Sequence, residues 1–324
     1  MSDRETVDFL ATVPLLEGRE EADLVELARA MRRRTVRKGE ILWRQGDDAR
    51  ELLFIVDGAV SAWLQLPGDR TVEIGSVGRG EVVGELGLLD GEGHTMSVRV
   101  AETATVLALG RLDFAALLAG AQPSAFSLKR RLASLFAARL RIQLRHLALS
   151  LGDETAGLPA EDAPPALADL ESCPPPDSRY VRRMATFNEF DPLALWGFLT
   201  SGSYVRCPPG RTLIAEGAPS TAYYLTINGA VEKVLVRGDR RIRVGLAGPG
   251  KAFGYESLID GRPSPVTAIS RERAVLLVLP RAVFEQLFNG EDGVSRVFLD
   301  VIQRDLVATL RQTLRPCARL AASV

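Results

Sequence analysis

At 324 residues, the chain is long enough for about two domains, each with its own hydrophobic core. It is 46% hydrophobic and carries a formal net charge of −1, which is the composition of a soluble globular protein without general attraction to nucleic acid or anionic membranes. The three scattered cysteines, Cys173, Cys207 and Cys317, argue against a disulfide framework. Because no secretory signal or membrane-length apolar run is visible, we expect a cytoplasmic protein with no membrane partner.

The first half of the chain predicts a helix followed by a row of short strands. The helix is expected at Glu20–Met31. Strands are expected where β-branched and aromatic residues are bounded by Gly, Asp or Pro: ILWRQ (41–45), ELLFIVDG (51–58), AVSAWLQL (59–66), TVEIGSV (71–77) and TVLALGR (105–111). Short strands at this close spacing are typical of an all-β barrel or jelly roll.

A glycine-rich stretch, GEVVGELGLLDGEGHTMSV (80–98), interrupts these strands. It passes from a turn into a short acidic and apolar segment and then into a polar strand. That order indicates a cradle of backbone N–H groups for an anion. No Arg or Lys lies within the stretch to complete the charge, so it is compatible with a ligand site, a degenerate site or a plain turn.

A long amphipathic helix is predicted at Ser124–Leu151. Its apolar residues recur at spacings of three and four: Leu132, Phe136, Leu140, Leu144, Leu147 and Leu151. Six basic residues share the helix: Lys129, Arg130, Arg131, Arg139, Arg141 and Arg145. Such charges can contact nucleic acid, but they more often form the solvated face of a helix, and the neutral net charge favours that interpretation.

The segment Gly152–Ser178, GDETAGLPAEDAPPALADLESCPPPDS, is rich in Pro, Ala and acidic residues and has little periodicity. This composition predicts an exposed linker. We therefore place the first domain, with its long C-terminal helix, at residues 1–151, the linker at 152–178 and the second domain at 179–324.

The second half repeats the pattern of the first. A helix is predicted at Asp191–Leu199, where Asp followed by Pro is typical of a helix start. Strands are again expected: TLIAEG (212–217), YYLTING (223–229), AVEKVLVR (230–237), IRVGLAG (242–248) and AVLLVLP (274–280). A second long amphipathic helix, Val294–Leu314, follows them with apolar residues at Val297, Val301, Leu306 and Leu310.

Glycines of the two halves correspond at fixed distances. Gly39, Gly46 and Gly58 recur 171 positions later, and the following set recurs 170 positions later: Gly75, Gly78, Gly80, Gly84 and Gly91 match Gly245, Gly248, Gly250, Gly254 and Gly261. Shared glycines at fixed spacing predict that the same backbone requirements, a positive φ or a close approach, arise twice. A tandem duplication explains this pattern.

The order of helix, jelly roll, glycine cradle, strand and long helix resembles the cyclic nucleotide-binding domain. The motifs KGEILWRQGD, FIVDGAV and GELGLLDGE in the first half, and PGRTLIAEG, LTINGAV and FGYESLIDGRPSP in the second, follow the order of that family. The family includes the catabolite activator protein and the regulatory subunits of protein kinase A. The resemblance implies a mainly β fold with flanking α-helices, made of two tandem double-stranded β-helix (jelly-roll) domains, each followed by an amphipathic helix.

The resemblance also implies a ligand site. In the family, a Gly-Glu pair opens the phosphate-binding cassette, the Glu holds the ribose 2′-hydroxyl, free N–H groups hold the cyclic phosphate, and an Arg pairs with it. Carried onto the first domain, these positions fall on Gly84, Glu85, Leu86, Gly87, Leu88, His94 and Thr95. The expected ligand is cAMP or cGMP, and no other cofactor is implied.

His94 stands where the family has Arg, which leaves two interpretations. A protonated imidazole can supply part of the phosphate contact, or His94 is an exposed loop residue beside a vestigial pocket. Arg99 is on the following strand in the wrong register to replace the Arg.

The second domain departs further from the family. Its corresponding positions are Gly254, Tyr255, Glu256, Ser257, Ser264 and Pro265, with Tyr in place of Glu and Ser in place of Arg. A carboxylate one place late, at Glu256, is expected to repel a phosphate. Either this pocket is retuned for another ligand, or the domain is kept for packing or partner contact; we favour the second.

Other classes of protein fit less well. A metal-dependent cupin needs a cluster of His and carboxylate ligands, whereas His94 and His146 are the only histidines, and no catalytic motif is present, so we expect neither an enzyme nor a metal site. A transcription factor would need a helix-turn-helix domain, which we do not expect in the short tail after the last helix.

We therefore expect a cytoplasmic cyclic nucleotide sensor, dimeric through the first long helix, that signals to a separate protein effector. The alternative is a degenerate scaffold or dimerisation protein of the same fold.

Overall fold

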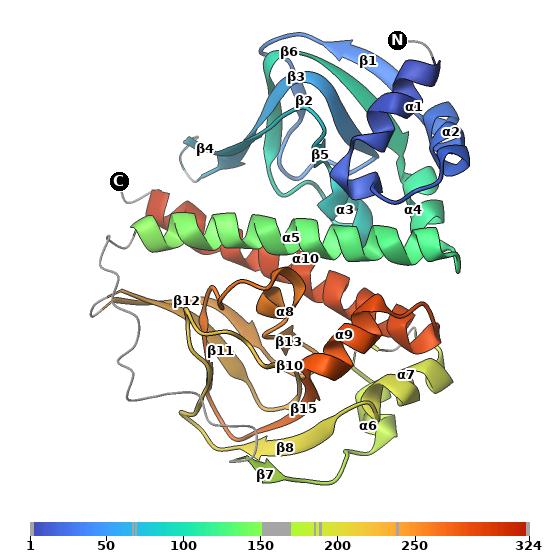
Figure 1. Ribbon diagram of the computed structural model, residues 1–324. Helices are drawn as coiled ribbons and strands as arrows, with labels where there is room; N and C mark the ends of the chain where they lie inside the picture. Colours follow the sequence, from blue (N-terminus) through green and yellow to red (C-terminus); the bar gives the residue numbers. More distant parts are fainter. Residues whose placement is uncertain are drawn as a thin grey trace. The chain divides into compact units, whose positions relative to one another are not determined.

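The computed structural model describes residues 3–66, 68, 70–150, 170–184, 186–187, 190–237 and 240–321. The chain divides into two compact units, Met1–Leu132 with Ala318–Val324, and Ala133–Cys317. Figure 1 labels most of the helices and strands of both units. The long helix α5 (Pro123–Ser150) belongs to both units, since the division falls within it.

The first unit consists of an antiparallel sheet with helices before and after it. Its helices are α1 (Asp3–Ala11), a 3-10 turn (Pro14–Leu16), α2 (Glu21–Ala30), α3 (Glu85–Asp90) and α4 (Arg111–Ala119), followed by the start of α5. Its strands are β1 (Arg32–Val36), β2 (Ile41–Trp43), β3 (Glu51–Gln65), β4 (Thr71–Val77), β5 (Val82–Val83) and β6 (Ser97–Gly110). The sheet has the order β1-β6-β3-β4, with β2 paired to β6 and β5 paired to β3.

The core of the first unit lies between these strands. A cluster of buried apolar side chains fills it: Val36, Trp43, Leu53, Ile55, Val60, Val83, Val98, Val100, Ala104, Val106 and Ala108. The sequence predicted two strands at 51–58 and 59–66, whereas β3 is one long strand. It continues through Gly58, where a φ of 78° and a shift in register mark a bulge. Only glycine fits at this position, because an added Cβ would lie 2.5 Å from Thr103 O.

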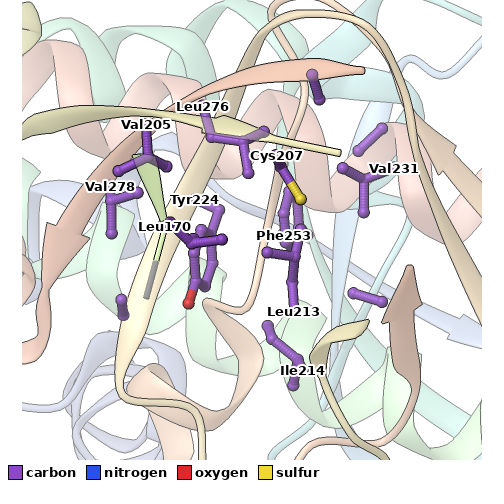
Figure 2. Close-up of a cluster of buried hydrophobic side chains, with 14 residues drawn as sticks. Leu170, Val205, Cys207, Leu213, Ile214, Tyr224, Val231, Phe253, Leu276 and Val278 are labelled. Atoms are coloured by element: carbon purple, nitrogen blue, oxygen red, sulfur yellow. The ribbon is translucent and has the colours of Figure 1, made fainter. Parts of the chain in front are cut away.

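The second unit has two antiparallel sheets. Its strands are β7 (Glu171–Ser172), β8 (Ser203–Cys207), β9 (Thr212–Ile214), β10 (Ala222–Asn228), β11 (Val231–Arg237), β12 (Arg240–Ala247), β13 (Ala252–Phe253), β14 (Thr267–Ser270) and β15 (Ala274–Pro280). One sheet has the order β13-β10-β15-β8-β7 and the other β12-β11-β14-β9. Figure 2 shows the buried cluster of this unit, where Tyr224 and Phe253 stack with ring centroids 4.9 Å apart beside Cys207 and Leu276.

The helices of the second unit are α6 (Ser178–Arg182), α7 (Pro192–Leu199), α8 (Glu256–Asp260), α9 (Arg281–Asn289) and α10 (Gly293–Ala321). The predicted start of α7 is confirmed, since the Asp191 carboxylate accepts hydrogen bonds from Leu193 N and Ala194 N at 3.0 and 2.9 Å. The second half of α5 is joined to α10 by a buried hydrogen bond of 2.6 Å, which Thr313 Oγ1 donates to Gln143 Oε1.

The predicted long helices are confirmed, and their apolar stripes are buried within this one chain. The described stripe residues of α5 are at most 3% exposed: Leu132, Phe136, Leu140, Leu144 and Leu147. Leu151 lies outside the described residues. The basic residues of α5 do not form one solvated face, because Lys129 is buried and Arg141 is paired with Asp260.

The exposed linker expected at 152–178 ends earlier than the sequence indicated. Residues 151–169 lie outside the described part of the chain, but Leu170 is buried in the core and Glu171–Ser172 pair with β8. Cys173 N then donates to Tyr204 O at 2.9 Å. The end of this segment is therefore ordered by the burial of Leu170 and by backbone hydrogen bonds to β8, although its Pro-rich composition predicted an exposed linker. The domain boundaries 1–151 and 179–324 stay predictions.

The repeated glycines meet the predicted backbone requirement at most positions. Six pairs have a positive φ in both copies: Gly39/Gly210, Gly46/Gly217, Gly58/Gly229, Gly80/Gly250, Gly84/Gly254 and Gly91/Gly261. Gly75/Gly245 and Gly78/Gly248 do not. Of these four, only Gly245 lies close to another group, where an added Cβ would be 2.8 Å from Lys233 Cε.

Candidate functional site

The cassette of the first domain is a short helix entered through a left-handed glycine. Gly84 follows β5 and is the N-cap of α3 with a φ of 102°. An added Cβ there would lie 2.8 Å from Glu51 O, so both the conformation and the space require glycine. The first N–H groups of a helix have no partners within the helix, and this is the part of a helix that binds anions.

Glu85 and Gly87 are held inside this cassette. Glu85 is 2% exposed, so its carboxylate belongs to the interior of the domain. At Gly87 an added Cβ would come within 2.6 Å of Ala49 Cβ and 2.8 Å of Glu92 O. The helix therefore lies against the Ala49 segment before β3, and only glycine allows that approach. Leu86 is also buried, while Leu88 is partly exposed.

His94 is buried against the cassette, so its interpretation as an exposed loop residue is wrong. Its ring is stacked on the indole of Trp43 with centroids 4.2 Å apart and an interplanar angle of 10°. The side chain lies beside the N-cap, with Cε1 3.7 Å from the position of a Cβ on Gly84. Two backbone hydrogen bonds of 2.8 Å, to Asp47 O and from Gly46 N, fix the loop. Thr95, the next residue, is half-buried.

Trp43 was not predicted as a site residue from the sequence, although comparison of the two repeats points to it. The corresponding residue in the second domain is Ile214, whose Cδ1 lies 2.8 Å from the position of a Cβ on Gly254. In both copies a large side chain from the same strand lies against the left-handed glycine of the cassette. The change from aliphatic to aromatic in the first copy accompanies His94, because the two planar rings stack.

Arg99 lies over an aromatic ring on the surface of the first domain. It is an exposed residue of β6, and its guanidinium lies over the ring of Trp63, 5.4 Å from the centroid. Both side chains line a surface cavity of about 330 Å³ together with Arg44, Gln65 and Ser97. The neighbouring Val98, by contrast, points into the core. The alternation of a strand thus separates Arg99 from the interior, as the register argument expected.

The cassette of the second domain is hydrogen-bonded to helix α10. Gly254 has a φ of 84°, and Tyr255 follows it at the position of Glu85. The Tyr255 hydroxyl, fully buried, donates a 2.5 Å hydrogen bond to Asp305 Oδ2 on α10. Ala252 N donates to the other oxygen of Asp305 at 3.3 Å. Burial, then the adjacent Asp305 and Glu256 charges, raises the pKa of the Tyr255 phenol well above its ordinary value.

Glu256 lies in the interior of the domain beside a buried lysine. It is 3% exposed, and burial raises the pKa of its carboxyl group, while the Lys233 charge opposes that shift. Lys233, on β11, is 4% exposed, and its Nζ donates to Thr309 Oγ1 on α10 at 3.1 Å. An acidic and a basic side chain, Glu256 and Lys233, are therefore both buried inside this domain. Ser257, next along the helix, is buried as well.

Ser264 and Pro265 supply no cation where the family has Arg. The Ser264 hydroxyl donates to Val266 O at 2.8 Å, and its backbone N–H donates to Ala218 O at 2.8 Å. Its polar atoms thus stabilise the turn that contains it, and Pro265 is half-buried beside it. The turn is also held from outside by Arg141 of α5, which pairs with Asp260 at the end of α8 and donates to Pro263 O at 2.7 Å.

The described residues contain neither a membrane-spanning helix nor a group of metal ligands. No helix among them has an apolar stretch long enough to cross a bilayer. Within the same part of the chain, no three His, Cys, Asp or Glu side chains are grouped so as to hold a metal ion.

The chain is similar to curated proteins over a limited segment. It is 37% identical over 106 residues to a cyclic nucleotide-gated potassium channel from Mesorhizobium japonicum, which covers 33% of this chain and 28% of the channel. It is 33% identical over 106 residues to the cAMP-dependent protein kinase type II regulatory subunit of Drosophila melanogaster, covering 33% of this chain and 27% of that protein. The chain thus spans little more than a quarter of the length of these relatives.

Among solved structures, the regulatory domain of Toxoplasma gondii PKA with cAMP is 17% identical, with a TM-score of 0.36, covering 88% of this chain and 91% of that one. The Thermus thermophilus catabolite activator protein is 25% identical, with a TM-score of 0.35, covering 43% and 68%. The profile of the family described as "Cyclic nucleotide-binding domain" matches residues 33–120 and 204–291, more than half of the chain, each match containing one of the two cassettes. The chain therefore belongs to the cyclic nucleotide-binding domain family and carries two of its domains in tandem.

Proposed function

We propose that the first domain binds a cyclic nucleotide, cAMP or cGMP, and that the chain is a non-enzymatic regulatory protein which signals its ligand state to a separate protein partner. The observation that carries this proposal is the first cassette, where Gly84 is a left-handed N-cap and Glu85 is turned into the interior. A buried carboxylate next to a helix N-terminus offers an acceptor for a ribose hydroxyl and N–H donors for a phosphate.

His94 is the group that would replace the missing Arg. Its ring lies beside the N-cap, and its stacking on Trp43 fixes the plane of the imidazole. A protonated imidazole in that place is a hydrogen-bond donor with a positive charge, and its face on the indole is stabilised by a cation–π contact. His94 thus acts as a pH-dependent phosphate contact, with Thr95 next to it, while Leu86, Gly87 and Leu88 supply the backbone of the cassette.

The second domain takes no nucleotide in this proposal. Gly254, Tyr255, Glu256, Ser257, Ser264 and Pro265 occupy the corresponding positions, but their polar groups bond to α10 or to their own turn or lie buried. The Tyr255–Asp305 bond ties the cassette to the final helix, and the Lys233–Thr309 bond ties β11 to the same helix. We assign this domain to packing and partner contact.

The chain forms a homodimer through α5 in this proposal, but by a different face from the stripe at Leu132–Leu151. That stripe is buried within the single chain, whereas Ile142 and Leu149 are 54% and 57% exposed. The two residues lie seven positions apart and therefore on one side of the helix. A second copy would cover them. Sedimentation of the intact protein and of an Ile142→Lys variant tests this point, with dissociation expected for the variant alone.

Calorimetric titration of the intact chain with cAMP, cGMP and cyclic dinucleotides tests the ligand. We expect one binding event per chain with a micromolar or lower Kd for cAMP or cGMP. Silence across the panel would favour the second candidate, a scaffold of the same fold without a ligand. That candidate is favoured by the second cassette, which is hydrogen-bonded to α10.

A further inference from the structure

Strands β1 and β8 are the same strand in the two copies of the repeat, and they differ at their outer edge. The shift of 171 positions places Arg32–Val36 on Ser203–Cys207. In the second domain the outer edge of β8 is covered by β7, a two-residue strand that precedes β8 in the chain (Figure 1). In the first domain β1 ends the order β1-β6-β3-β4, and among the described residues no strand pairs with its outer edge.

The covered copy shows what this edge accepts. β7 runs antiparallel to β8, with Glu171 opposite Arg206 and Ser172 opposite Val205. Arg206 Nη1 donates to Glu171 Oε1 at 2.8 Å, and Cys173 N donates to Tyr204 O at 2.9 Å. The occupant is thus a short extended segment that contributes backbone hydrogen bonds and one carboxylate.

The uncovered copy carries a basic strip that its twin lacks. Arg32, Arg33, Arg34 and Thr35 are all exposed, and Arg37 and Lys38 follow them, also exposed. The five basic residues correspond to uncharged residues of the second domain, namely Ser203, Tyr204, Val205, Pro208 and Pro209, while Thr35 corresponds to Arg206. Arg34 pairs with Glu51, but in the described part of the chain Arg32, Arg33, Arg37 and Lys38 form no ion pair. The strip is local, since the whole chain has a net charge of −1.

A row of charges on an edge strand also has a purely protective use, because it keeps two edges of the same kind apart. Protection and recognition are compatible here. Unpaired N–H and C=O groups together with guanidinium groups repel a second basic edge and attract an acidic one. The second domain supports recognition, since the equivalent edge of its sheet is occupied by an extended segment that bears a Glu.

We propose that the outer edge of β1 is a docking site for an extended acidic segment of a partner protein, which adds to the sheet as an antiparallel strand. Successive side chains of a strand point to opposite faces, so carboxylates on both faces of the added strand meet Arg32 on one side and Arg33 on the other. Backbone hydrogen bonds along β1 provide affinity, and the arginines select for acidic sequences.

Fluorescence anisotropy of the intact chain with a labelled ten-residue peptide tests the proposal. The peptide carries a central Glu-Glu-Asp run between Val and Thr residues. We expect one peptide per chain, because β7 already covers the equivalent edge of β8. The double variant Arg32→Glu/Arg33→Glu should weaken binding at least about tenfold. The matched control Arg182→Glu/Arg183→Glu reverses two adjacent exposed arginines of the second unit and should stay within about twofold of the wild type.

A second peptide, N-methylated at every residue, separates strand addition from simple charge attraction. It keeps every carboxylate but has no backbone N–H group on either edge, so its binding should be lost as well. Equal affinity of the N-methylated peptide, equal affinity of the Arg32→Glu/Arg33→Glu variant, or full competition by a single-stranded oligonucleotide at the same charge concentration would overturn the proposal. Thermal unfolding of both double variants checks that each is folded.

Discussion

The hydroxyl of Tyr255 and the carboxylate of Asp305 form a 2.5 Å hydrogen bond that joins the second cassette to the last helix of the chain. Both residues are buried, and they are separated by fifty positions in the sequence. At the corresponding place of the first domain, Glu85 is buried within the cassette. One position of the repeat thus serves a proposed ligand contact in one copy and a helix attachment in the other.

Tyr255→Phe should therefore lower stability without affecting ligand binding. The substitution keeps the ring but leaves the buried Asp305 without this donor, which should lower the free energy of unfolding by about 1–3 kcal/mol. Urea denaturation measures the change, and calorimetry with cAMP or cGMP should give the wild-type affinity. An unchanged midpoint would mean that the bond does not hold the helix.

Gly84→Ala should destabilise the first domain more than Gly91→Ala. Both glycines cap α3 in the left-handed region, but only at Gly84 would an added Cβ meet backbone, 2.8 Å from Glu51 O. At Gly91 nothing lies within 4 Å, so the cost there is that of conformation alone, about 1 kcal/mol. Thermal unfolding of the two variants compares them, and equal losses would contradict the packing argument.

Glu85→Ala should abolish cyclic nucleotide binding by the first domain. The carboxylate is the proposed acceptor for the ribose hydroxyl, and it lies inside the cassette. Titration calorimetry of this variant beside Tyr255→Phe makes the comparison, because the second substitution changes the equivalent position of the other domain. Binding by Glu85→Ala at the wild-type level would remove the site from the first cassette.

Affinity for a cyclic nucleotide should fall as the pH rises from about 6 to 8, through the ordinary titration range of a histidine. In the proposed site the imidazolium of His94 binds the phosphate, whereas the neutral imidazole lacks the charge. In His94→Arg the charge persists over this range, so the profile should become flat and the affinity at pH 8 should rise by about ten- to a hundredfold. A flat profile for the wild-type protein would exclude the phosphate contact.

Glu256 should make the stability of the second unit depend on pH. Burial raises the pKa of its carboxyl group above the reference value of 4.5, so the folded state holds the proton more tightly than the unfolded state. Its favourable contribution is complete below pH 4.5 and is lost as the pH rises through the raised value. Glu256→Gln should gain in melting temperature relative to the wild type as the pH rises above 4.5. The exposed Glu285→Gln is the control and should show no such trend.

The features that depend on local backbone chemistry could be predicted from the sequence. Glycines with a positive φ, such as Gly84 and Gly254, are specified by the residue at that position, and their spacing revealed the duplication and the place of both cassettes. The long helices followed from apolar periodicity, and the start of α7 from the Asp191 cap. Each of these signals lies within a few residues of the structure that it predicts.

Contacts between side chains that are far apart in the sequence could not be predicted from it, because they depend on the folded structure. Trp43 stacks on His94, Asp305 reaches Tyr255, and Leu170 enters a core built from later strands. The strands β1 and β8 were missed for the same reason, since RRRTV and SYVRC gain their strand conformation by pairing with β6 and β15. Local propensity is a weak preference in such segments, and long-range pairing and burial outweigh it.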